Sequence, residues 1–191
     1  MKKTLLLLGL VLVSAFSIKA QSLTIDNLGN SGGPSDSTSG LIYTDNAAGT
    51  ALALWDGSSD LNMVVMAGAT SGSLSTLVSL TGSGAITFAG SGQFLDTTGN
   101  SYAVAGAGAT AFFQIYAWLG NYASYNDALT AGGSTAVTGV FSNPVAAAPN
   151  FPPNLSDMPS MVLAPAAVPE PTTIALLGLG AASLLVFRRR K

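Results

Sequence analysis

Residues 109–119 read ATAFFQIYAWL, and this stretch decides the fold class. Its side chains change character with a period of two, which is the period of a β-strand. One set is apolar and the other amphipathic: Phe113, Ile115, Ala117 and Leu119 against Phe112, Gln114, Tyr116 and Trp118. We expect the first set to face a core and the second set to lie on a partly covered face.

Outward from this strand, short apolar stretches alternate with turns rich in Gly, Ser, Thr, Asn and Asp. The spacing of about 8–12 residues is typical of a β-sandwich or barrel. Further strands are predicted at residues 22–26, 41–44, 51–55, 61–67, 74–80, 85–88, 102–105 and 135–141. Residues 121–130 predict a short helix or a long loop. We therefore predict an all-β, jelly-roll-like β-sandwich over residues 21–141.

The composition changes after this domain, because eight of the nine prolines lie between Ser142 and Pro171. Such a segment predicts an extended, semi-rigid linker over residues 142–168 that holds the domain away from a membrane. Within it, residues 158–163 are apolar enough for an edge strand, where proline is tolerated.

Charge is distributed unevenly along the chain. No Lys, Arg or His lies between Gln21 and Phe187, and the nine acidic residues of the chain all lie there, so this section carries a net charge of −9. A domain without cations cannot neutralise phosphates, which excludes nucleic acid as a partner. Without Cys or His it has no thiolate nucleophile and no imidazole ligand. We predict that the protein is not an enzyme; a hydrolase with an aspartate pair is the alternative, for which the sequence singles out no pair.

The N-terminus has the three zones of a secretory signal peptide over residues 1–20. Lys2 and Lys3 precede an apolar run at residues 5–13, and a more polar stretch leads to Ala20. We predict cleavage by signal peptidase between Ala20 and Gln21. An uncleaved N-terminal anchor is the alternative, although the apolar run is shorter than the roughly 20 residues of a spanning helix.

The C-terminus over residues 169–191 has three parts in order. Pro169, Glu170 and Pro171 come first, an uncharged segment rich in Leu, Ala and Gly follows at residues 172–187, and the chain ends in Arg188, Arg189, Arg190 and Lys191. A helix over residues 172–187 would be about 24 Å long, close to the roughly 30 Å of hydrocarbon that a transmembrane helix crosses. The basic cluster predicts a membrane stop on the cytoplasmic side, with the preceding domain outside.

This three-part tail resembles the PEP-CTERM sorting domain. The resemblance implies recognition by an exosortase, a transient stay in the inner membrane and cleavage near Pro169–Pro171. It further implies transfer to the cell surface or extracellular matrix of a Gram-negative bacterium that makes exopolysaccharide. A plain single-pass anchor is the alternative. Residues 116–141 are also similar to small β-sandwich ectodomains found with such tails.

The most polar loop contains Asp56 and Asp60 with Gly57, Ser58 and Ser59 between them. Oxygen-only ligands suit Ca²⁺, which takes 6–8 of them, although the EF-hand pattern and its bidentate Glu are missing. The same residues are typical of a hairpin turn in which Asp and Ser side chains accept from backbone amides. The sequence leaves both interpretations open, and it indicates no other cofactor.

Seven aromatic residues could form a face that stacks on sugar rings: Trp55, Tyr102, Phe112, Tyr116, Trp118, Tyr122 and Tyr125. Trp118, Tyr122 and Tyr125 are the candidates that we single out, and filling the core is the alternative. Together these features predict an exported, exosortase-processed surface or matrix protein with a structural or adhesive role. The alternative function is a carbohydrate-binding module for exopolysaccharide, with or without calcium.

Overall fold

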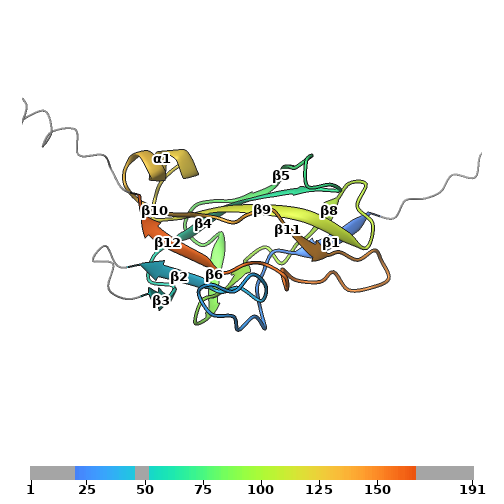
Figure 1. Cartoon of the computed structure of the whole chain (residues 1–191), viewed down its shortest axis with the longest axis horizontal. Coiled ribbons are helices and arrows are strands. Elements are labelled where there is room, and N and C mark those ends of the chain that lie inside the picture. Colours follow the sequence, from blue (N-terminus) through green and yellow to red (C-terminus); the bar gives the residue numbers. More distant parts are fainter. Residues whose placement is uncertain (1–19, 46–51, 167–191) are drawn as a thin grey trace, which may run out of the picture.

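The computed structural model describes residues 20–45 and 52–166 (Figure 1). The strands are β1 (Gln21–Thr24), β2 (Ile42–Asp45), β3 (Leu52–Leu54), β4 (Leu61–Gly68), β5 (Ser75–Leu80), β6 (Ile86–Gly90), β7 (Gln93–Asp96), β8 (Ser101–Val104), β9 (Thr110–Leu119), β10 (Ser134–Val137), β11 (Phe141–Pro144) and β12 (Met161–Pro165), and the helix is α1 (Tyr125–Thr130). Within these ranges no helix is both long and apolar enough to cross a membrane. The predicted signal helix and the predicted transmembrane helix lie outside the described residues.

The long strand β9 organises the larger sheet and runs across the view in Figure 1. In the part of the chain that the structure describes, this sheet has eight strands in the order β3-β2-β12-β10-β9-β4-β5, and β11 also pairs with β9. Strand β4 is antiparallel to β9 over its whole length, from Leu61 opposite Leu119 to Gly68 opposite Phe112. On the other edge of β9, strand β10 pairs with its second half and β11 with its first half. The prediction of an all-β domain is confirmed.

Two ribbons form a second, smaller layer. Strand β1 pairs with β8, β6 pairs with β7, and a bridge between Asp26 and Leu95 connects the ribbons. Apolar side chains of both ribbons and of the large sheet form one buried cluster, which includes Leu23, Ile25, Ile42, Met63, Val65, Phe94, Val104, Phe113, Ile115, Met161 and Leu163. The layers are unequal and β12 is parallel to β2, so the arrangement differs from the jelly roll that we expected.

The alternation predicted for β9 is confirmed on the side that faces the core. Phe113, Ile115 and Ala117 are fully buried, whereas Phe112 and Gln114 are partly exposed. A fully buried Phe or Ile side chain contributes about 1.5–3 kcal/mol through removal of apolar surface from water. The inner side of β9 is therefore a central part of the core.

The single strand predicted at residues 135–141 is two strands in the structure. Between β10 and β11, Thr138 bonds twice to Ile115: its backbone N–H donates to the Ile115 carbonyl (2.9 Å) and its hydroxyl accepts from the Ile115 N–H (2.9 Å). A side chain thus replaces a backbone group in the ladder, and the strand is interrupted there. Strand β7, which has only four residues, was not predicted.

The fold continues well beyond Phe141, where we expected it to end. Strand β12 lies between β2 and β10, with Met161 opposite Ile42 and Thr135 opposite Ala164, so it is an interior strand and not an edge strand. Met161 and the preceding Met158 are buried in the core. Proline is tolerated because Pro165 is the last residue of β12, where a missing N–H interrupts nothing. Residues 142–165 are therefore part of the domain and not an extended linker.

Buried asparagines hold the loops of this cation-free domain together. Asn27 and Asn30 both donate to the Gly40 carbonyl, at 3.1 Å and 3.2 Å. Asn62 donates to the Gly120 carbonyl (2.9 Å) and accepts from the Gly82 N–H (2.7 Å). Among the described residues, every buried side-chain nitrogen and oxygen has a hydrogen-bond partner. Neutral amides thus cross-link loops where other proteins use ion pairs.

Candidate functional site

The outer side of the large sheet carries a row of half-exposed side chains. In β9 the row consists of Phe112, Gln114 and Tyr116. Directly opposite Tyr116 are Val64 of β4 and Val137 of β10, and Met66 of β4 is opposite Gln114. Cross-strand partners project to the same side of a sheet. We call this surface the outer face; its residues are Val64, Met66, Phe112, Gln114, Tyr116 and Val137.

Polar groups on the outer face are held in place by hydrogen bonds. The Tyr116 hydroxyl donates to Oε1 of Gln114 (3.2 Å), and Nε2 of Gln114 donates to the Thr138 carbonyl (3.2 Å). The Tyr116 ring also meets the ring of Tyr125 from α1 edge to face, with centroids 5.2 Å apart. Rings, an amide and a phenol on one half-exposed surface are the groups that proteins use to bind sugar rings and their hydroxyls.

Helix α1 and the connection before it cover one end of β9. The helix begins after Ser124, whose hydroxyl accepts from the Asp127 N–H (3.1 Å), and Ala128 is its buried residue. Trp118 lies at this end and is fully buried, with its indole N–H donating to the Tyr122 carbonyl (3.0 Å). A fully buried ring cannot stack on a sugar, so Trp118 is a core residue and not the stacking residue that we predicted.

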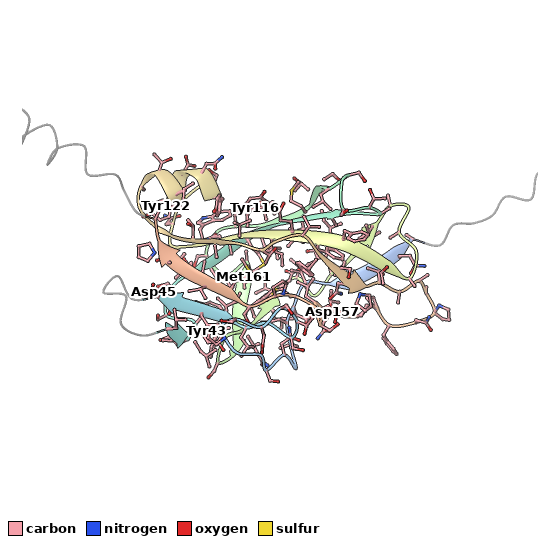
Figure 2. The ribbon with its side chains drawn as sticks, in the orientation of Figure 1. Tyr43, Asp45, Tyr116, Tyr122, Asp157 and Met161 are labelled. Carbon is pink, nitrogen blue, oxygen red and sulfur yellow. The ribbon has the colours of Figure 1, made fainter. Side chains whose placement is uncertain are left out.

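The other two predicted stacking residues remain half-exposed but do not act as a pair. Tyr125 adjoins the outer face through Tyr116. Tyr122 lies by α1, away from Tyr116 in Figure 2. Its ring packs so closely on Gly133 that a Cβ added to this glycine would be 2.9 Å from the ring. Sequence periodicity placed Phe112, Gln114 and Tyr116 on the correct side of β9, and it was wrong only for Trp118.

An open pocket of about 440 Å³ lies at the Phe112 end of the outer face. We call it the Asp157 pocket; it is lined by Ser37, Thr38, Ser71, Phe112, Val140, Phe141, Ser142 and Asp157. Phe112 and Ser142 are cross-strand partners on β9 and β11. Sequence reasoning missed Ser142 and Asp157, because it assigned them to a linker.

A second pocket, of about 350 Å³, lies between the β4–β5 hairpin and β8. Its lining consists of residues 67–69, 73, 75–77 and 103–105, which are small or aliphatic apart from serines and a threonine. It contains no aromatic ring and no charged group. Of the two pockets, the Asp157 pocket offers the more varied chemistry.

The predicted calcium loop forms a tight turn. The Ser58 N–H donates to Oδ1 of Asp56 (2.9 Å), and hydrogen bonds from the Ser58 hydroxyl and then from its N–H lower the pKa of the Asp56 carboxyl below its usual value. Asp60 accepts from the Ser83 hydroxyl (3.3 Å). The described residues contain no group of three or more His, Cys, Asp or Glu side chains placed to hold a metal ion. Calcium at Asp56 and Asp60 stays a prediction.

The buried carboxylate of Asp96 is used in hydrogen bonds that hold the local fold together. It accepts from the Tyr102 hydroxyl (2.6 Å) and from the hydroxyl and N–H of Thr98 (2.7 Å and 2.9 Å). Burial, and then the hydrogen bond to Asp96, raise the pKa of the Tyr102 phenol above its usual value. Every contact of this carboxylate stabilises the turn between β7 and β8.

Comparison with known protein families finds a match at the C-terminal end of the chain. Residues 167–191 match the model of the PEP-CTERM protein-sorting motif, which confirms the resemblance seen at Pro169, Glu170 and Pro171. No curated protein and no solved structure matches the chain. The motif implies export and membrane-anchored processing by an exosortase. Arg188–Lys191, the predicted membrane stop, lie within the matched residues and outside the described ones.

Proposed function

We propose that this chain is the precursor of a surface or extracellular-matrix protein with a structural or adhesive role in a Gram-negative bacterium. Signal peptidase would release Gln21, and an exosortase would cut near Pro169–Pro171 after a transient stay in the inner membrane. One observation carries the proposal: the strands run from Gln21 to Pro165, so both predicted cuts lie just outside the folded domain. Either cut would leave every strand of the described residues intact.

The chemistry of the domain supports a non-catalytic role outside the cell. The whole chain lacks Cys and His, so it has neither a thiolate nor an imidazole for nucleophilic or acid–base catalysis. Its fold depends on apolar burial and on neutral amides such as Asn27 and Asn143, and on no disulfide. Such a domain has no disulfide that its surroundings could reduce.

The intact mass of the protein in each cell fraction of its host tests this proposal. We expect a product that starts at Gln21, ends near Pro169–Pro171 and is found outside the inner membrane. Replacing Glu170 with Ala should leave an unprocessed form, whereas replacing Asp127, an exposed acid in α1, should not. A wild-type product that keeps Arg188–Lys191 in the inner membrane would contradict the proposal and indicate a permanent anchor.

A second candidate, binding of exopolysaccharide, is favoured by the outer face. Phe112, Gln114 and Tyr116 present two rings and an amide in one row that ends in a pocket. We expect a signal on a glycan array that Tyr116→Ala weakens and that Phe151→Ala, a change at a ring 94% exposed on the loop between β11 and β12, leaves unchanged. EDTA in a parallel array tests whether calcium at Asp56 and Asp60 contributes. If the wild-type protein gives no binding signal on any glycan, this candidate function is refuted.

A further inference from the structure

The Asp157 pocket combines three kinds of group in one open cavity. Phe112 supplies a ring, Asp157 supplies a carboxylate, and hydroxyls come from Ser37, Thr38, Ser71 and Ser142. These residues come from the loop before β2, the β4–β5 hairpin, β9, β11 and the loop before β12. The pocket is therefore a product of the tertiary fold.

Hydrogen bonds position the backbone of Asp157, and one more reaches its carboxylate. The backbone N–H of Asp157 donates to Oδ1 of Asn143 (2.9 Å). The Ser156 hydroxyl donates to Oδ1 of the Asp157 carboxylate (3.3 Å). Asn143 is fully buried and is fixed in turn by donating to the Asn154 carbonyl (2.8 Å). Because a buried side chain fixes the backbone of Asp157, this part of the pocket loses little conformational freedom when a ligand binds.

The net negative charge of the domain favours ligands that carry positive charge. Residues 21–166 contain eight aspartates and no Lys, Arg or His, so their net charge is −8. No side chain of the domain can neutralise Asp157, and the potential over the pocket is negative. A polyanionic glycan is repelled by such a surface, whereas a cationic one is attracted and oriented.

We propose that the Asp157 pocket binds one sugar unit of an amine-bearing glycan, a polymer of hexosamine whose amino groups are not acetylated. The Asp157 carboxylate accepts from the ammonium group, the serine and threonine hydroxyls exchange hydrogen bonds with the sugar hydroxyls, and the Phe112 ring covers the apolar face of the sugar. The volume of about 440 Å³ lies within the range of small-molecule sites. This inference rests on the carbohydrate-binding candidate above and names its ligand class.

Isothermal titration of the full-length protein with two probes, glucosamine tetrasaccharide and its N-acetylated form, tests the inference. We expect wild type to bind the amine form about tenfold more tightly, the effect of one charge-assisted hydrogen bond. Asp157→Asn should abolish this preference while it keeps the backbone bond to Asn143. Asp45→Asn is the matched control: it removes the same charge from β2, far from Asp157 in Figure 2, and should keep the preference.

The outcomes separate this inference from the function on which it rests. If Asp157→Asn and Asp45→Asn reduce the preference equally, the general charge of the domain and not the pocket is responsible, and the inference is overturned. If wild type binds both tetrasaccharides equally and Phe112→Leu weakens both, carbohydrate binding stands and the amine-specific pocket is refuted. If wild type binds neither, both are refuted, and the proposal of a sorted surface protein is unaffected.

Discussion

Replacing Asn27 with Ala tests whether buried amides hold this domain together. The Asn27 side chain is fully buried and makes three hydrogen bonds to the backbone. Its Nδ2 donates to the carbonyls of Gly40 and Gly92 at 3.1 Å each, and its Oδ1 accepts from the Phe94 N–H at 2.7 Å. One side chain thus connects the loop before β2 with the β6–β7 hairpin.

The expected loss follows from these contacts. A hydrogen bond contributes about 1 kcal/mol net, and a buried group that loses its partner costs about 1–3 kcal/mol. Both carbonyl acceptors keep another partner, since Asn30 donates to Gly40 and Ile42 donates to Gly92. We therefore expect Asn27→Ala to lower the free energy of unfolding by about 3–4 kcal/mol, a large part of the about 5–15 kcal/mol typical of a domain.

Urea unfolding followed by tryptophan fluorescence measures this loss, because Trp55 and Trp118 are both buried. The control Asn150→Ala removes an exposed amide and should change the free energy of unfolding by less than about 0.5 kcal/mol. A loss below about 1 kcal/mol for Asn27→Ala, close to that of the control, would refute the reasoning. The loops would then be held by backbone contacts alone.

Three further predictions concern the core, pH and the end of the fold. Trp118→Ala should lower the free energy of unfolding by about 3–5 kcal/mol in the same urea assay, since it empties a core site; a loss typical of a surface residue would contradict its burial. The raised pKa of Tyr102 means that the folded state keeps a proton that the unfolded state releases near its usual value of 10.0, so stability is complete below that pH and falls above it. Unfolding midpoints at rising pH should show this decline for wild type and a weaker one for Tyr102→Phe, and equal slopes would contradict it. A chain that ends at Pro153 lacks β12 and should show no protease-resistant domain, whereas one that ends at Ala166 should show it; resistance of both would mean that β12 is dispensable.

Much of the domain could be predicted from local pattern. The alternation of Phe113, Ile115 and Ala117 with Phe112 and Gln114 predicts both the strand and its inner side, because successive side chains of a strand point to opposite faces. Most of the predicted strands match observed strands to within two residues. Short-range chemistry sets these features, so no knowledge of distant residues is needed to find them.

The candidate site could not be predicted in the same way. Trp118 has the correct period for the outer face, yet the chain folds back over it and Tyr122 binds its indole. Asp157 and Ser142 reach the pocket only because residues 142–165 pack on the sheet. Proline content indicated a linker, since proline disfavours strands in general, but the prolines here lie at strand ends and in loops.

The sequence by itself determined the all-β class, the absence of any cation in the domain and the sorting motif at residues 167–191, because composition, side-chain period and a contiguous motif are local properties. The tertiary structure alone decided that β12 lies inside the sheet beside β2, that Trp118 belongs to the core and that Phe112 and Asp157 share a pocket. The pairing of Met161 with Ile42 shows the reason. Which distant strands become neighbours depends on how all the apolar surfaces are buried at once, and no local pattern records that.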